Sequence, residues 1–385
     1  MPTYPNNIDS KLPMVGTTIF TVMSKLASDE KAINLSQGFP DFESDPVLID
    51  LVYKYMKDGF NQYAPMQGVP ALRESIANKI KSLYGTSYNP ETEITVTAGA
   101  TQAIYTAISA VIKEGDEVII FTPAYDCYAP AIEINSGKPV YIQLNPEDYS
   151  IDWEQVKKML NRKTKMIIIN TPHNPTGSIL SNKDLKNLEQ ITKESNIIVL
   201  SDEVYEHIIF DRESHQSVAR FPVLAERSFA VYSFGKTFHN TGWKLGYCIG
   251  PENLMKEFNK VHQFNVFCCN APIQYALAEY MTDENNYNYI PEFYQKKRDI
   301  FINALDGSKF KITPSAGTYF QLLDYSNISD EKDKEYAVQL TKTNKIASIP
   351  LSPFYSTDPN NKVLRFCFAK QDETIEKAAK ILAQL

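Results

Sequence analysis

The sequence predicts an α/β protein with a large domain built on a mostly parallel, mixed sheet flanked by helices, plus a smaller α+β domain. Three observations lead to this prediction. The chain has 385 residues, more than one hydrophobic core usually holds, so two domains are expected. Short, continuously apolar runs alternate with helical patterns through its middle, as buried parallel strands and their crossover helices do. The C-terminal part shows a different, mixed pattern.

Each expected element follows from the local residue pattern. In the middle of the chain, strands are expected at 93–97, 117–121, 139–144, 165–170, 197–201 and 229–233. The helices between them are expected at 101–112, 125–136, 151–160 and 182–194. Further on, strands are expected at 319–323 and 363–368, and helices at 333–343 and 372–384. We place the large domain at residues 41–284 and the smaller domain at residues 1–40 and 285–385.

Charge and composition exclude several classes of function. The formal net charge is −7, which gives no reason to expect nucleic acid or an anionic membrane as a partner. The N-terminus lacks the apolar segment of a signal peptide, and no apolar run is long enough to span a bilayer. The five cysteines have no metal-ligand spacing, so we expect reduced thiols, no metal and a cytoplasmic location.

Candidate functional residues follow the expected strands. Ligands of doubly wound sheets bind beyond the carboxyl ends of the strands. A glycine turn begins at Ala98, and Asn174, Asp202 with Tyr205, and Lys236 follow three other strands. Together they offer a phosphate-sized turn, an amide, a carboxylate with a phenol, and an amine. An aldehyde cofactor with a ring nitrogen, a phenolic oxygen and a phosphate would require these groups.

These motifs resemble those of the class I/II aminotransferases, which are fold-type I enzymes dependent on pyridoxal 5'-phosphate. The resemblance lies in the segments Ser233–Tyr247 (SFGKTFHNTGWKLGY), Asn61–Gly68 (NQYAPMQG) and Pro172–Gly177 (PHNPTG). It extends over nearly the whole chain, from Ser36 to Arg365. Within the family, the chain is most similar to the group that contains methionine aminotransferases and the glutamine/kynurenine transaminases. The resemblance therefore implies a pyridoxal phosphate enzyme that moves amino groups.

The resemblance implies roles for four residues. Lys236 corresponds to the lysine that forms a Schiff base with the cofactor and then carries protons. Asp202 corresponds to the carboxylate that keeps the pyridine nitrogen protonated, which makes the ring an electron sink. Tyr205 and Asn174 correspond to the donors to the phenolic oxygen. Alone, each residue also has an ordinary structural interpretation, such as a helix cap for Asp202 or core packing for Tyr205.

A phosphate site is implied at the helix that opens with Gly99, Ala100 and Thr101, because a helix N-terminus attracts anions. Ser233 and Lys244 correspond to its hydroxyl and cationic ligands. Many related families have an arginine where Lys244 stands. Lysine keeps the charge but lacks the bidentate fork of arginine.

Four residues are expected around the cofactor ring and the substrate. Tyr125 corresponds to the aromatic residue that stacks on the ring. Tyr63 corresponds to a tyrosine that reaches the phosphate of the neighbouring subunit, which implies a homodimer. Arg365 corresponds to the arginine that binds the substrate α-carboxylate in two parallel bonds. Gly38, together with Asn174, is expected to complete the carboxylate site.

The implied reaction has two halves with ping-pong kinetics: an amino acid gives its amino group to the cofactor, which passes it to a 2-oxo acid. No second arginine that would select a dicarboxylate side chain is identifiable. Aromatic residues are expected to line an apolar pocket, namely Phe20, Tyr63, Tyr125 and Phe354. We therefore expect methionine or an aromatic amino acid as the donor.

Three other functions are compatible with parts of this pattern. A carbon–sulfur β-lyase acting on cysteine conjugates would use the same lysine and carboxylate sites. A non-enzymatic effector-binding domain of a transcription regulator is disfavoured by the acidic charge and by the aminotransferase pattern starting almost at residue 1. A generic nucleotide-binding enzyme would need a G-x-G-x-x-G or Walker sequence, and neither is present. His173, His207 and His239 have no metal-ligand spacing and are expected to be structural.

Overall fold

The computed structural model describes all residues from 1 to 385, and its largest sheet has seven strands in the order β2-β8-β7-β6-β5-β3-β4. The strands are β2 (Ile94–Thr97), β3 (Glu117–Thr122), β4 (Lys138–Gln143), β5 (Thr164–Asn170), β6 (Ile198–Asp202), β7 (Ser228–Ser233) and β8 (Gly246–Ile249). Strands β4, β3, β5, β6 and β7 run parallel to one another. β8 is antiparallel to both of its neighbours. The predicted mixed, mostly parallel sheet is thereby confirmed.

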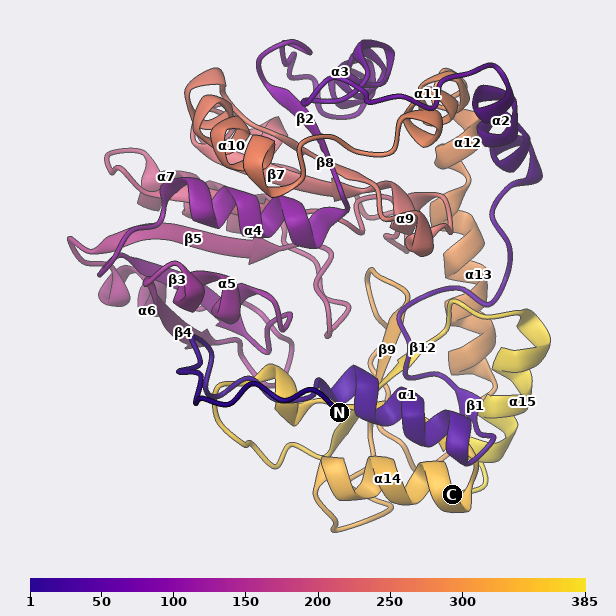
Figure 1. The fold of residues 1–385 in the computed structure, drawn as a ribbon. Coiled ribbons are helices and arrows are strands. Elements are labelled where there is room, and N and C mark those ends of the chain that lie inside the picture. The colour runs from indigo at the N-terminus through magenta and orange to yellow at the C-terminus, as the bar shows by residue number, and fades with distance from the viewer.

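Helices cover both faces of this sheet (Figure 1). Alternate residues of β5 show how its two faces divide: Met166 and Ile168 pack on one side, and Ile167 and Ile169 on the other. The first face is covered by α4 (Ala100–Val111), α5 (Tyr128–Ile134) and α10 (Glu252–Asn265). The second is covered by α3 (Pro70–Tyr84), α6 (Trp153–Met159) and α7 (Asn182–Thr192). Burial on both faces explains why the strands read as continuous apolar runs.

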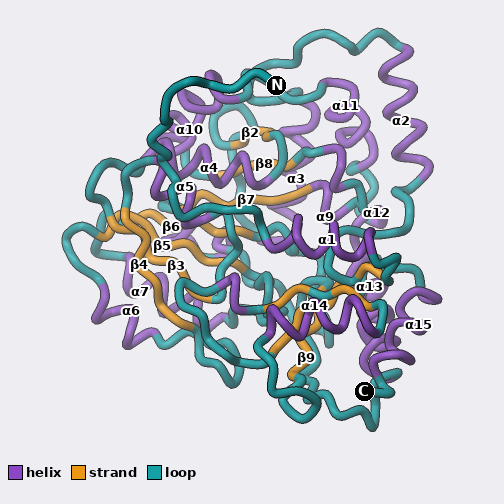
Figure 2. The backbone as a smooth tube through the Cα atoms, turned by 60° about the horizontal axis from the view of Figure 1, so that its bottom comes forward, coloured by secondary structure: helices purple, strands orange, loops and turns teal.

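The remaining elements build a smaller group around a three-stranded antiparallel sheet with the order β11-β12-β9. Its strands are β9 (Phe320–Asp324), β11 (Ile349–Pro350) and β12 (Val363–Cys367), and its helices are α13 (Ile290–Asn303), α14 (Asp333–Thr343) and α15 (Asp372–Leu382). The N-terminal segment joins this group, because β1 (Ile33–Asn34) pairs in parallel with β10 (Ile346–Ala347). Figures 1 and 2 both place α1 (Ile19–Asp29) beside α14.

Most of the other elements connect these two groups or lie at their edges. The helices are α2 (Pro46–Lys57), α8 (Pro222–Ala225), α9 (Phe234–Thr237), α11 (Ala271–Tyr280) and α12 (Asn285–Asn288). Three short 3-10 helices are η1 (Val218–Arg220), η2 (Thr241–Trp243) and η3 (Ser352–Phe354). No helix combines the length and the apolar character that crossing a membrane would take.

The observed helix ends agree with the predicted ones in some helices and differ in others. α14 has the predicted bounds, with Asp333 and Glu335 in its first turn, where acidic residues favour a helix. The helix expected at 125–136 is shorter and begins at Tyr128. Tyr125 therefore lies in the loop after β3 and not in a helix, which corrects the prediction. The loop conformation places the Tyr125 side chain at the carboxyl ends of the strands, on the wall of the cavity described below.

Candidate active site

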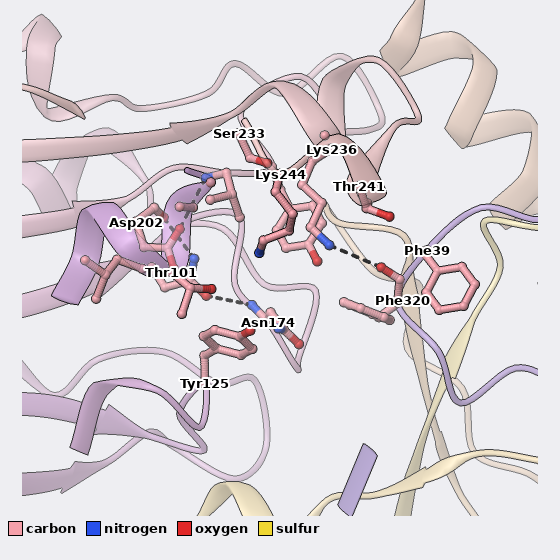
Figure 3. Close-up of a pocket in the computed structure, with 18 of the residues that line it drawn as sticks. Phe39, Thr101, Tyr125, Asn174, Asp202, Ser233, Lys236, Thr241, Lys244 and Phe320 are labelled. Atoms are coloured by element: carbon pink, nitrogen blue, oxygen red, sulfur yellow. Dashed lines mark hydrogen bonds between the residues drawn. The ribbon is translucent and has the colours of Figure 1, made fainter. Parts of the chain in front are cut away.

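A cavity of about 250 Å³ lies at the carboxyl ends of the central strands, where the N-terminal segment and β12 meet the large sheet. Figure 3 shows the side chains that converge on it from several elements. Nearly all the predicted site residues lie on its wall: Gly38, Gly99, Ala100, Thr101, Tyr125, Asn174, Asp202, Tyr205, Ser233, Lys236, Lys244 and Arg365. Residues separated by more than 300 positions therefore share one small volume.

Lys236 projects from the short helix α9, directly after β7. Its Nζ donates hydrogen bonds to the carbonyl oxygen of Gly38 at 3.1 Å and to the phenol oxygen of Tyr319 at 2.8 Å (Figure 3 shows the first). Burial lowers the pKa of this amine to about 8, and the charges of Arg365 and Lys244 act in the same direction. Near neutral pH, Lys236 can therefore exist both as an ammonium and as a free amine.

Asp202 is the last residue of β6 and is almost fully buried. Its Oδ2 accepts a hydrogen bond from the Tyr128 phenol at 2.6 Å, and its Oδ1 accepts one from the Val204 amide at 3.3 Å. Burial nevertheless raises the pKa of the carboxyl group to about 6, against the opposing effect of the Tyr128 bond. The carboxylate would therefore be stabilised by a cationic group of a ligand in the cavity.

Arg365 lies in the middle of β12, and its side chain is only 1% exposed. Its Nη1 donates to Asn174 Oδ1 at 2.7 Å, and its Nη2 donates to the Ser36 carbonyl at 3.3 Å. The guanidinium stacks on the Phe320 ring, 3.8 Å from the ring centroid. Its buried Nε has no hydrogen-bond partner. A buried cation with neutral partners and a spare donor is suited to the carboxylate of a ligand.

Backbone amides and an ammonium group meet at the N-terminus of α4. Gly99 caps this helix without a side-chain bond and has a φ of +81°. A Cβ atom placed on Gly99 would lie 3.4 Å from Lys244 Nζ. Gly246 lies close to the first amide of the helix, since a Cβ atom placed on Gly246 would lie 3.2 Å from the Ala100 nitrogen. The Ala100 and Thr101 amides have no backbone acceptor, and free amides at a helix start beside a lysine form an anion site of the kind that binds phosphate.

Aromatic side chains form part of the cavity wall. Phe20, Phe39, Tyr125 and Phe320 all line it. Phe354 was expected on the wall as well, but it lies behind Phe20, with the ring centroids 5.8 Å apart. The cationic residues on the wall are Lys236, Lys244 and Arg365. The chain thus provides a single arginine for binding a carboxylate in this cavity.

Tyr63 does not line the cavity of its own chain. Its side chain is 84% exposed, and its ring meets the edge of Phe267 at a centroid distance of 5.3 Å. An exposed aromatic ring makes few contacts within its own chain, so it can pack against another protein surface without giving up buried contacts. Its expected role in a neighbouring subunit stays a prediction.

Two residues at the site were not anticipated as functional. Tyr128 donates to Asp202 from the first turn of α5, although 74 positions separate the two residues. Tyr319, just before β9, contacts Lys236 although 83 positions separate them, and no local pattern indicates this.

The histidines have structural contacts, such as His239 Nδ1 with the Tyr294 phenol at 2.9 Å. No group of three or more His, Cys, Asp or Glu side chains could hold a metal.

An amine of tuned pKa, a buried carboxylate, an arginine and an anion-binding helix start, gathered in an α/β fold, define an enzyme that acts on small amino and oxo acids. The chain belongs to the aminotransferase class I and II family, whose sequence model matches residues 30–382. The protein is therefore an aminotransferase, as its motifs predicted.

Proteins that are similar over most of their length support this assignment. The chain is 48% identical to a methionine aminotransferase of Escherichia coli (strain K12), over 98% of both chains. It is 34% identical to kynurenine–oxoglutarate transaminase 3 of Homo sapiens, over 95% of this chain and 87% of the relative.

Solved structures agree with these matches. A crystal structure from Escherichia coli, reported to identify a methionine aminotransferase function, superimposes with a TM-score of 0.96 at 47% identity, covering 99% of this chain and 100% of the other. An aromatic aminotransferase from Pyrococcus horikoshii superimposes with a TM-score of 0.86 at 32% identity, covering 95% and 98%. The relatives named here are all aminotransferases, so neither the lyase nor the non-enzymatic alternative gains support.

Proposed function

We propose that this aminotransferase uses pyridoxal 5'-phosphate and takes methionine, or another amino acid with an apolar or aromatic side chain, as its amino donor. The observation that carries this proposal is the composition of the cavity wall. The wall combines the Lys236 amine and the buried Asp202 carboxylate with a single arginine, Arg365, among aromatic side chains. The amine and the carboxylate suit the cofactor, whereas the arginine and the aromatic side chains suit the substrate.

The residues present fit the cofactor at each of its polar groups. Asp202 would pair with the protonated ring nitrogen, which would remove the cost of burying its charge. Tyr205 and Asn174 would donate to the phenolic oxygen. Tyr125, in its loop, would face the ring. When bound, pyridoxal phosphate supplies an aldehyde for amine exchange and a ring that withdraws electrons from the substrate α-carbon.

The phosphate would be held at the start of α4. The first amides of this helix, at Ala100 and Thr101, have no side-chain cap to compete with a ligand, whereas the Gly99 amide donates to the Thr97 carbonyl at 2.7 Å. The Lys244 ammonium stands beside Gly99, and the Ser233 hydroxyl lies on the same cavity wall. Helix dipole, amides and ammonium all favour a dianion here.

Arg365 and Lys236 would act directly on the substrate. The Arg365 fork would hold the α-carboxylate in two parallel bonds, with the guanidinium already oriented by Asn174, Ser36 and Phe320. That clamp would place the α-hydrogen beside Lys236 Nζ. As a free amine, Lys236 would accept this proton, and as an ammonium it would return a proton in the second half of the reaction.

The substrate side chain would meet aromatic surface. Phe20 and Phe320 line the cavity against Arg365, Phe39 also lines it, and no second arginine lies on the wall. A dicarboxylate side chain buried there would lack a counter-ion, at a high cost. The similarity to a methionine aminotransferase at 48% identity supports the same substrate class.

We also propose a homodimer in which Tyr63 completes the phosphate site of the partner subunit. The segment from α2 to Tyr63 exposes several large apolar side chains, namely Val47, Ile49, Tyr53, Met56 and Phe60. Phe267, whose ring meets that of Tyr63, and Phe264 on α10 are exposed as well. Burying such a patch against a second copy is favourable.

Two further predictions belong to this proposal. The division into a large domain at 41–284 and a small domain at 1–40 and 285–385 is supported by the pairing of β1 with β10. A cytoplasmic location is supported by the five free cysteines.

A steady-state assay with a panel of amino donors tests the substrate class. We expect kcat/KM for methionine or phenylalanine to exceed that for aspartate by about tenfold or more, because burying a second carboxylate without a counter-ion costs more than the mismatch of one methylene, which alone is worth about 10–200-fold. An absorbance spectrum of the purified protein tests the cofactor in parallel. A strong preference for aspartate would contradict the proposed substrate, and a protein that gains no cofactor band on addition of pyridoxal phosphate would contradict the proposed cofactor.

A further inference from the structure

Tyr319 contacts the amine of Lys236 but does not belong to the cavity wall. It is fully buried and immediately precedes β9. Its phenol oxygen lies 2.8 Å from Lys236 Nζ, and its hydroxyl also donates to the Gly38 carbonyl. The same carbonyl accepts a second hydrogen bond from Lys236, at 3.1 Å. The amine, the phenol and the carbonyl therefore form a closed triangle.

The direction of each hydrogen bond in this triangle follows from the inventory of protons. A carbonyl oxygen can only accept, so the single phenol proton of Tyr319 is committed to Gly38. The phenol oxygen then faces Lys236 as an acceptor. A neutral amine has two N–H groups and one lone pair, and here both N–H groups have acceptors. The lone pair is then directed away from these two acceptors, and because Lys236 lies on the cavity wall, it is available to a substrate α-hydrogen in the cavity.

We propose that Tyr319 is a positioning residue for proton transfer: together with the Gly38 carbonyl, it fixes the free Lys236 amine so that its lone pair faces the substrate. This inference rests on the proposed function, because it concerns the steps in which Lys236 is not bonded to the cofactor. In the ammonium form the two bonds stay in place, and the third N–H then points to the cavity. One arrangement thus serves proton removal and proton return.

The surroundings hold Tyr319 in this position independently of its hydroxyl. Its carbonyl accepts from the Phe368 amide at 3.0 Å. Its ring packs edge-on against Tyr205 at a centroid distance of 5.1 Å and lies 5.7 Å from Tyr294. Removing the hydroxyl alone should therefore leave the fold and the neighbouring rings in place. The titratable groups around Lys236 come from four segments: Asp202 on β6, Tyr205 after it, Lys244 before β8, and Arg365 and Cys367 on β12.

The experiment compares Tyr319→Phe with a matched control, Tyr325→Phe. Tyr325 is also fully buried and donates to a backbone carbonyl, that of Glu331 at 2.9 Å, but it is remote from the cavity wall. For each holoenzyme, kcat, KM and the isotope effect of α-deuterated methionine are measured. For each full-length chain freed of cofactor, the pKa of Lys236 is measured by competitive acetylation and peptide mass spectrometry.

We expect Tyr319→Phe to lower kcat about tenfold or more, with KM little changed and a larger α-deuterium isotope effect, because a misplaced base slows proton transfer. The Lys236 pKa should fall by up to about one unit, since an ammonium loses a stronger hydrogen bond than a neutral amine does. Tyr325→Phe should change neither property.

The inference is overturned if Tyr319→Phe keeps the wild-type kcat and Lys236 pKa. It is also overturned if kcat, KM and thermal midpoint decline together without a change in isotope effect, which would indicate a merely structural role. Borohydride reduction of the wild type separates this result from a failure of the proposed function. If the wild type is trapped at Lys236 and Tyr319→Phe behaves like it, only the inference fails, whereas a wild type that is not trapped removes both.

Discussion

Arg365 Nη1 and Asn174 Oδ1 are joined by a hydrogen bond of 2.7 Å, although 191 positions separate these residues in the sequence. Arg365 belongs to β12 of the smaller sheet, and Asn174 to the turn that follows β5 of the large sheet. The bond therefore fixes the arginine relative to the cavity by linking the two sheets. The substrate site depends on how the two parts pack, and not on either part alone.

Replacing Arg365 by lysine should weaken substrate binding while leaving the cofactor in place. Lysine keeps the charge but loses the fork and the bond to Asn174. We expect kcat/KM for methionine to fall by roughly 10- to 100-fold, the equivalent of losing a hydrogen bond to a charged group. Steady-state kinetics and the cofactor absorbance band measure both effects. An unchanged kcat/KM would show that the carboxylate binds elsewhere.

Replacing Asp202 by asparagine should stabilise the cofactor-free chain at alkaline pH but impair the enzyme. Burial raises the pKa of Asp202 to about 6 from its usual 3.8, so the folded chain binds this proton more tightly than the unfolded chain does. Stability contributed by this group is present below about pH 4 and is lost as pH rises to about 6. At pH 8 the loss amounts to about 3 kcal/mol.

Urea unfolding of the cofactor-free Asp202→Asn variant measures this effect. The variant should be more stable than the wild type by up to about 3 kcal/mol at pH 8 and by less at pH 5. With cofactor present, its turnover should fall by about a hundredfold or more, because the ring nitrogen loses its carboxylate. A variant that is less stable at pH 8 would contradict the assigned cost of burying Asp202.

Replacing Gly99 by alanine should weaken the cofactor site specifically. At φ +81° and ψ 168°, Gly99 adopts a conformation that is strained by about 1–3 kcal/mol for any other residue. The added methyl group would also reach Lys244 Nζ. Titration with pyridoxal phosphate should show an affinity lower by about tenfold or more. Gly85→Ala is a control, because Gly85 also has a positive φ but has open space around it.

A subunit-mixing experiment tests the proposed role of Tyr63 in the partner subunit. Tyr63→Ala and Lys236→Ala should each give a homodimer with little or no activity. In a mixed dimer, one site carries both changes and the other carries neither. Refolding equal amounts together should therefore restore about a quarter of the wild-type activity. If Tyr63 served its own chain, mixing would restore none.

The sequence was informative wherever local rules apply. Asp202, Asn174 and Lys236 were predictable because strand ends of a parallel sheet share one edge. β8 was not predicted, because its four residues follow no hairpin signal and one of its two partners, β2, is distant in sequence. The contact of Tyr319 with the site could not be predicted either. Its contact with Lys236 depends on the packing of the smaller sheet against the larger one, which no local pattern describes.

The most direct test of this account is borohydride reduction of the holoenzyme, followed by peptide mass spectrometry. We expect the absorbance band of the bound cofactor to disappear and one peptide, the one containing Lys236, to gain the mass of the reduced cofactor. The Lys236→Ala variant should bind pyridoxal phosphate and show no such peptide and no turnover. Labelling at another lysine, or turnover by Lys236→Ala at the wild-type rate, would contradict the central assignment.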